Sequence, residues 1–220
     1  MRKFNYFCSI LLVITLPLMI VILSSNLILR TSTFYTYHFN DSQALNKIYY
    51  SIGEGDMADE ISSYWSSFSS KDFQVYEING EYKDPVFDKD EQAVMKKAKS
   101  ILNIELLAGV VLLIITIAIY VYFVKHNFID ALRNRFRIGA GLTVALMIAN
   151  VACFMTKGFR LWLYNSLIGV ELEKKATLTI VLGDPLYETY ILFSTALAAV
   201  ALGIFIFVNH KYTKPARIFY

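Results

Sequence analysis

Four long apolar runs without any charged side chain dominate the pattern of hydrophobic and polar positions. They are Phe4–Leu29, Leu106–Val124, Ile138–Thr156 and Thr189–Val208, and each holds at least 19 residues. A helix rises about 1.5 Å per residue and the hydrocarbon core of a membrane is about 30 Å thick, so each run is long enough to span. The pattern therefore predicts an α-helical membrane protein with four transmembrane helices.

Charge is divided unequally between the segments that join these spans. Residues 1–3, 125–137 and 209–220 hold nine positive side chains and a single negative one, Asp130. The remaining joining segments hold the other twelve of 21 positive and seventeen of 18 negative side chains. Short loops rich in Lys and Arg face the cytoplasm. We therefore expect a multi-pass protein of the cell membrane with both termini cytoplasmic.

The first outer segment, 30–105, shows two short amphipathic patterns. Apolar residues at i, i+3, i+4 and i+7 predict a helix capped by Asp41, and a Gly-containing break at 53–56 separates it from a second helix of the same kind. The first stripe is Leu45, Ile48, Tyr49 and Ile52, and the second is Ile61, Tyr64, Trp65 and Phe68.

A hairpin signal follows these helices. Asn79-Gly80 joins the runs FQVYEI (73–78) and EYKDPVF (81–87), and Asn-Gly between alternating runs favours a tight turn. Asp88 and Glu91 then have the spacing of a capping box, from which a helix continues into the second span. Segment 30–105 is thus predicted to be a small α/β extracytoplasmic domain.

The second outer segment, 157–188, is apolar but too short to cross a membrane. FRLWLYNSLIGV (159–170) predicts an interfacial helix between the third and fourth spans. Phe159, Trp162, Leu163 and Leu167 share its apolar face, whereas Arg160, Tyr164 and Asn165 avoid that face.

Several classes of site are disfavoured by composition. The only cysteines, Cys8 and Cys153, lie in predicted spans, so no disulfide framework is expected in the outer domain. No metal-ligand cluster and no Gly-rich phosphate loop is present in the sequence, and the basic excess fits membrane topology rather than nucleic-acid binding.

The first span is predicted to be an uncleaved anchor, because its apolar run is too long for a signal peptide and no cleavage site follows.

Histidine is scarce, and its positions limit the chemistry. His126 and His210 fall in cytoplasmic segments and read as solvated interface residues. His38 is the one outer histidine, within the aromatic run FYTYHFN (34–40). It is interpreted either as part of an interfacial aromatic belt or as a general base near the depth of the lipid headgroups.

Two further charged residues lie near the predicted outer boundary of the membrane. Glu105 ends the outer domain within ILNIELLAG (101–109), where a carboxylate either snorkels to the interface or has a function. Arg160 on the interfacial helix is placed to hold Glu105 or a lipid phosphate.

Several segments together resemble a family of small bacterial four-span membrane proteins, the lipoprotein intramolecular transacylases called Lit. The similar features are Leu16-Pro17 in the first span, TSTFYTYHF (31–39), VFDKDEQAVMKKAKSIL (86–102), FRLWLY (159–164) and GDPLYETY (183–190).

The resemblance implies a reaction. Lit enzymes move an acyl chain from the sn-2 position of a lipoprotein's diacylglyceryl-cysteine to the α-amino group of that cysteine, at the outer leaflet and without a cofactor. Membrane lipids and bacterial lipoproteins are then the expected partners. The family is thought to use two histidines, and Val94 and Arg160 stand near the matching positions here.

Two functions are consistent with these features. The first is an acyltransferase with His38 as the catalytic base and with Glu105, Arg160, Trp162 and Tyr164 binding the substrate. The alternative is a non-catalytic lipid- or lipoprotein-binding accessory protein, which the missing histidines favour. A transporter is disfavoured because the spans lack charge and no internal repeat is present. The sequence specifies no oligomeric state.

Overall fold

The chain folds into two compact units of helices. The computed structural model describes residues 2–48, 50, 52–69, 71–79, 82–169, 172 and 176–213. Met1–Ser25, Leu106–Asn150 and Ser194–Tyr220 form one unit, called the bundle unit here. Asn26–Glu105 and Val151–Phe193 form the other, called the aromatic unit.

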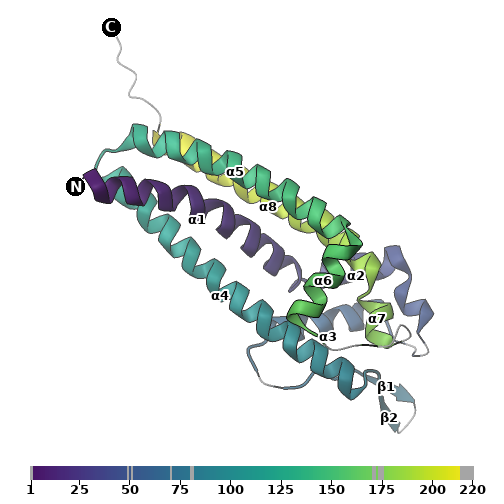
Figure 1. Cartoon of the computed structure of the whole chain (residues 1–220). Helices are drawn as coiled ribbons and strands as arrows, with labels where there is room; N and C mark the ends of the chain where they lie inside the picture. The colour runs from purple at the N-terminus through teal and green to yellow at the C-terminus, as the bar shows by residue number, and fades with distance from the viewer. Residues whose placement is uncertain are drawn as a thin grey trace. The chain divides into compact units, whose positions relative to one another are not determined.

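Four helices are long and apolar enough to cross a membrane, as the four charge-free runs predict. They are α1 (Arg2–Ile28), α4 (Lys89–Lys125), α5 (Ile129–Met155) and α8 (Asp184–Thr213) (Figure 1). The predicted continuation of the capping-box helix into the second span is confirmed, since α4 is a single helix of 37 residues.

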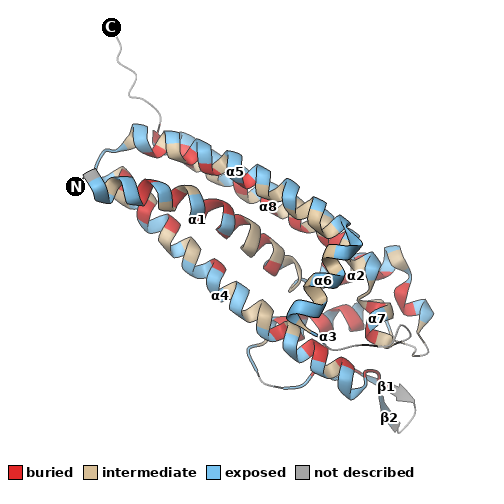
Figure 2. Cartoon of the chain, viewed as in Figure 1, coloured by how far each residue is buried: buried red, intermediate tan, exposed pale blue. Residues whose placement is uncertain are grey.

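The bundle unit is organised around α1. Leu12 and Leu16 of α1 are fully buried, and buried positions recur along α1 (Figure 2). Leu16 packs in a cluster with Phe136 of α5 and Leu202 of α8, whereas Leu12 packs in one with Phe123 of α4 and Leu132 of α5. The helices α1 and α4 also share a buried hydrogen bond, because Thr116 Oγ1 donates to Thr15 Oγ1 at 2.9 Å. Such hydrogen bonds link neighbouring helices within membranes.

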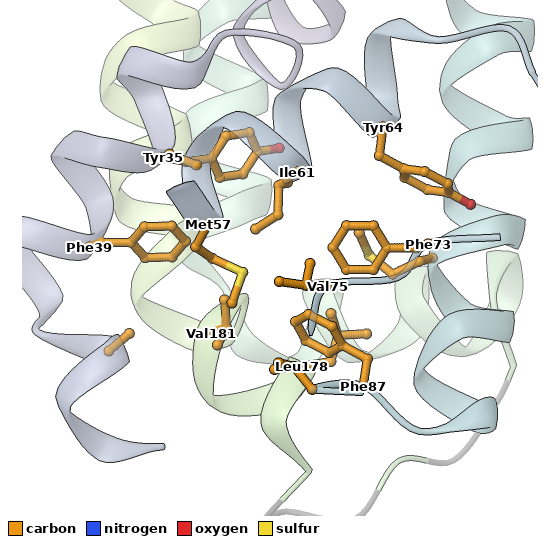
Figure 3. Packing of buried hydrophobic residues seen from close by; sticks show 14 of the residues in the cluster. Tyr35, Phe39, Met57, Ile61, Tyr64, Phe73, Val75, Phe87, Leu178 and Val181 are labelled. Carbon is orange, nitrogen blue, oxygen red and sulfur yellow. The ribbon is translucent and has the colours of Figure 1, made fainter. Parts of the chain in front are cut away.

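The aromatic unit has a core of interlocking rings. Its shorter helices are α2 (Ser32–Ser42), the 3-10 turn η1 (Ala44–Lys47), α3 (Glu54–Ser66), α6 (Lys157–Leu167) and α7 (Thr177–Val181). Tyr35 of α2, Ile61 of α3 and Val181 of α7 meet in this core, which also takes in Phe73 and Phe87 (Figure 3). Segments far apart in the sequence therefore close over one hydrophobic centre.

The predicted hairpin is confirmed. Strand β1 (Tyr76–Asn79) pairs antiparallel with β2 (Tyr82–Pro85), and Asn79 faces Tyr82 in the register. Gly80 and Glu81, which join the strands, lie outside the described residues. The rings before and after the hairpin, Phe73 and Phe87, contact each other at a tilt of 43° with centroids 4.9 Å apart and fix the hairpin to the core.

The predicted helix beginning at Asp41 is wrong. Asp41 lies near the end of α2, and Gln43 then adopts a left-handed backbone conformation with φ of 48°. The chain continues only as the short turn η1, and Ile48 is extended. The second stripe is confirmed in Ile61, Tyr64 and Trp65, which are buried on α3, whereas Phe68 follows the helix and is 76% exposed. Tyr49 of the first stripe lies outside the described residues.

The predicted capping box is confirmed at the start of α4. The amide of Glu91 donates to Asp88 Oδ1 and the amide of Asp88 donates to Glu91 Oε2, both at 2.8 Å. The second carboxylate oxygen, Glu91 Oε1, accepts a hydrogen bond from the amide of Leu178 at 2.7 Å. The buried Glu91 thus holds the first turn of α7 against the first turn of α4.

Candidate functional site

Two cavities of about 260 and 600 Å³ lie within the aromatic unit and share much of their lining. The shared residues are mostly apolar or aromatic and come from α3, α4, α6, α8 and the C-terminal end of α7. They include Trp65, Ala98, Arg160, Tyr164, Leu182 and Tyr187. We refer to the two cavities together as the Arg160 cavity. A concave site with many apolar side chains and few polar ones suits an acyl chain with a polar head.

Arg160 lines both cavities and is held from several sides, whereas the second cation of the lining, Lys157, lines only the larger cavity. Arg160 Nη1 donates to the carbonyl of Phe154 at 2.9 Å, and its Nη2 donates to Asp184 Oδ1 at 3.1 Å. The guanidinium also lies over the ring of Tyr187, 5.1 Å from the centroid. Its buried Nε–H has no hydrogen-bond partner among the described residues. A fixed, always charged donor is therefore available at the wall of the cavity.

Tyr164 lies one helical turn after Arg160 and lines both cavities. Burial raises the pKa of its hydroxyl, and the neighbouring Tyr187 raises that pKa further. The hydroxyl of Tyr164 thus stays protonated at neutral pH and keeps its capacity to donate a hydrogen bond.

Glu105 of α4 lines the smaller cavity. The backbone just before it is fixed by a polar network at the end of α1: Asn26 Nδ2 donates to the carbonyl of Leu102 at 2.7 Å. Arg30 donates to Asn26 Oδ1 and to Asn103 Oδ1, both at 2.8 Å. Glu105 and Arg160 share the cavity, but the partner of Arg160 is Asp184, which corrects the expectation of an Arg160–Glu105 pair.

Trp162 is not part of the lining of either cavity, and its side chain is 61% exposed. It stands two residues from Arg160, about 200° around an α-helix. Two residues of the predicted stripe, Leu163 and Leu167, do line the smaller cavity, but Arg160 and Tyr164, predicted to avoid that face, line it with them. The long-range partners of Arg160 turn that face inward, and periodicity within α6 does not reveal them.

His38 is buried in the core of the aromatic unit, with 1% of its surface exposed, and lines neither cavity. Its Nε2 lies 3.1 Å from the carbonyl oxygen of Val181, so Nε2–H is the donor and Nδ1 carries the lone pair. Nδ1 has no partner in the described part of the chain. Burial lowers the pKa of His38, which favours the neutral ring. These contacts tie α2 to α7.

Several residues of the cavity carry no sequence signal of a site. The sequence predicts Trp65 only as part of a packing stripe, and it indicates Tyr187 and Asp184 only as part of a motif. Val94, near a family histidine position, lines the larger cavity together with Arg160, near the other. Both positions thus face one space, although neither carries a base.

Comparison with known proteins gives one family. The model of the family described as lipoprotein intramolecular transacylase Lit matches residues 10–164, more than half of the 220 residues. A search of curated proteins returned no match.

Solved structures of one relative share the fold. The membrane integral lipoprotein intramolecular transacylase Lit from Bacillus cereus is 13% identical to this chain and superposes with a TM-score of 0.72. The superposition covers 96% of this chain and 98% of that one. A variant of the same protein in which one histidine is replaced by arginine is 10% identical with a TM-score of 0.68, covering 96% and 94% of the two chains. The corresponding alanine variant is 12% identical with a TM-score of 0.68, covering 97% of each chain.

Proposed function

Because the chain belongs to the lipoprotein intramolecular transacylase Lit family, we propose that it moves the sn-2 acyl chain of a lipoprotein's diacylglyceryl-cysteine onto the α-amino group of that cysteine. The Arg160 cavity is the proposed site. One observation carries this assignment: a half-buried guanidinium, whose buried Nε–H has no partner in the described chain, stands in the wall of a largely apolar cavity. The lining suits the acyl chain and the guanidinium suits the ester.

The proposed orientation places the aromatic unit outside the cytoplasm and both termini inside. The support is the concentration of Lys and Arg in the short segments 1–3, 125–137 and 209–220. In this orientation α6 is an interfacial helix at the outer leaflet. Trp162, exposed on its outer face, then takes the role of an interfacial anchor rather than a substrate contact.

The proposed reaction needs no atom from outside the substrate, because the acyl group and one proton only change places within it. The amine nitrogen bonds to the ester carbonyl carbon, the bond from that carbon to the sn-2 glycerol oxygen breaks, and one proton passes from nitrogen to that oxygen. An α-amino group has a pKa of about 8, so about a quarter of it is neutral at pH 7.5. The amine is thus a competent nucleophile once it is held against the ester.

Arg160 stabilises the negative charge that develops on the carbonyl oxygen. It cannot serve as a base because it stays protonated, but its Nε–H can donate to that oxygen. Glu105, which lines the same cavity, accepts the proton of the amine and returns it to the glycerol oxygen. The Tyr164 hydroxyl binds the polar part of the substrate between them.

His38 remains the residue that the sequence predicts as the base. Its Nδ1 has the lone pair that this role requires, but its burial away from the cavity lining favours a structural role between α2 and α7. The activity and the stability of a His38→Gln variant separate the two roles.

Purified protein in bilayers, supplied with a diacylated lipopeptide, tests the proposal by mass spectrometry of the N-acyl product. Arg160→Gln should lower the rate about 100-fold or more, the usual loss for one oxyanion donor. Arg160→Lys should also lose most activity, because a lysine cannot reproduce the guanidinium fork. Asn165→Ala, exposed on α6 and outside the cavity lining, is the matched control and should retain activity.

Full activity in Arg160→Gln would remove Arg160 from the mechanism. A folded wild-type protein that binds the lipopeptide without converting it would support the alternative of a non-catalytic lipid- or lipoprotein-binding protein.

A further inference from the structure

A second, basic cavity of about 480 Å³ lies in the bundle unit, between the first turns of α5 and the last turns of α8. Its polar lining is Arg133 and Arg137 of α5 with Asn209, His210 and Thr213 of α8. Phe136, Ala140 and Ile206 form its apolar lining. Neither acyl transfer nor the Arg160 cavity uses any of these residues.

The cations of this cavity are only partly neutralised. Arg133 donates to the carbonyl oxygen of Thr213 and lies 3.6 Å from Asp130, a residue whose side chain is 94% exposed. The side chains of Arg137 and His210 make no hydrogen bond or ion pair with any residue that the structure describes. The cavity thus presents one unpaired guanidinium and one imidazole beside a second, partly paired guanidinium, which is a setting for an anion.

The apolar part of the lining lies on the same helix faces as the arginines and the imidazole. Ala140 follows Arg137 by three residues on α5, and Ile206 precedes His210 by four residues on α8. A ligand that satisfies both regions has an anionic head and hydrocarbon chains. We propose that this cavity binds the phosphodiester headgroup of an anionic phospholipid, whose acyl chains lie along α5 and α8.

A net negative headgroup fits better than a zwitterionic one. Arginine forks bind phosphate oxygens in pairs, and basic pockets between membrane helices are known settings for anionic lipid headgroups. A choline headgroup carries the same phosphodiester, but its ammonium would be repelled by the two arginines. In the proposed orientation this cavity opens at the inner leaflet, although the proposal itself does not depend on acyl transfer.

Native mass spectrometry of the full-length protein in detergent, titrated with phosphatidylglycerol, phosphatidylcholine or inorganic phosphate, tests this site. Phosphatidylglycerol should bind about tenfold more tightly than phosphatidylcholine. A difference in affinity of this size is expected from one or two charge-assisted hydrogen bonds. Arg137→Gln should weaken phosphatidylglycerol binding by about tenfold and leave phosphatidylcholine binding unchanged. Arg137 is exposed and without a described partner, so the variant should fold.

Arg135→Gln is the matched control. It removes the same charge from the same turn of α5, about 200° around the helix from Arg137, and Arg135 is absent from the cavity lining. Binding by this variant should stay within about twofold of wild type, since a distant surface charge contributes little. Equal losses in Arg135→Gln and Arg137→Gln, or no preference for phosphatidylglycerol, would overturn the site. Full competition by millimolar inorganic phosphate would overturn the lipid assignment.

Discussion

Arg160 Nη2 donates a hydrogen bond to Asp184 Oδ1 at 3.1 Å, joining α6 to the first turn of α8 across the Arg160 cavity. This contact fixes the orientation of the guanidinium. Nη1 donates to the carbonyl of Phe154, so Nε is the guanidinium nitrogen without a partner among the described residues. The position of the proposed oxyanion donor thus depends on a residue 24 positions away in the sequence.

Asp184→Asn should therefore lower the acyl-transfer rate by about tenfold while changing the stability little, because an exposed ion pair contributes only about 0–1 kcal/mol. The neighbouring pair of Asp184 with Lys157, at 3.7 Å, is also exposed and adds little. Rate and melting temperature in detergent are the two readouts. Glu188→Gln, exposed one turn later on α8, is the charge-matched control, and an equal rate loss in both variants would contradict the positioning role.

Glu91→Gln should destabilise the aromatic unit. Both oxygens of the buried Glu91 carboxylate accept backbone N–H groups, and an amide side chain replaces one acceptor with a donor. An unsatisfied buried donor costs about 1–3 kcal/mol, so the melting temperature should fall by several degrees.

Asp90→Asn is the control for Glu91→Gln. Asp90 lies in the same first turn of α4 and is exposed. Its replacement should leave the melting temperature nearly unchanged. A melting temperature of Glu91→Gln equal to that of wild type would show that the contact with the Leu178 amide contributes nothing to stability.

Ala98→Phe should block the Arg160 cavity. Ala98 lines both cavities from α4, and a phenyl ring there would occupy the space proposed for the acyl chain. Turnover of a long-chain lipopeptide should fall by about tenfold or more, whereas a short-chain substrate should be less affected. Ala93→Phe, exposed on the same helix, should have no such chain-length effect. Equal loss for both chain lengths would argue against an acyl-binding role.

His38 should make stability depend on pH. Its pKa in the folded protein is below the ordinary value of 6.5, so the unfolded chain binds the proton more readily. The stability is complete above pH 6.5 and is lost as pH falls through 6.5 toward the folded pKa. His38→Gln keeps an N–H that can donate to Val181 and removes this titration.

Thermal unfolding between pH 7.5 and 5.5 should therefore show a smaller loss of melting temperature in His38→Gln than in wild type. The same variant should retain most acyl-transfer activity if His38 is structural. A loss of activity of about 100-fold or more with unchanged stability would instead support the predicted base role.

Local signals in the sequence identify much of the fold. The charge-free runs predict the four long helices, and the Asp88–Glu91 spacing predicts both hydrogen bonds of the capping box. The helix expected from Asp41 fails because Gln43 adopts a left-handed conformation, and nothing in the local pattern marks that break. The sequence does not predict helix α2, because its aromatic residues are typical of a membrane-interface belt.

The site is less predictable because its geometry depends on contacts distant in sequence. Arg160, Tyr164 and Glu105 were identified, and they share one cavity. The inward face of α6 depends on Asp184 and the carbonyl of Phe154, which the periodicity of α6 cannot show. The burial of His38 depends on Val181, 143 residues away, so the aromatic run alone does not distinguish a core histidine from a base.

Mass spectrometry of lipoprotein N-termini, from bacterial cells with and without this protein, tests the central claim most directly. We expect diacylglyceryl-cysteine N-termini to convert to N-acyl lyso forms only in cells that express the wild-type chain, and Arg160→Gln at equal expression to abolish the conversion. Unchanged N-termini in cells that express the folded wild-type protein would contradict acyl transfer.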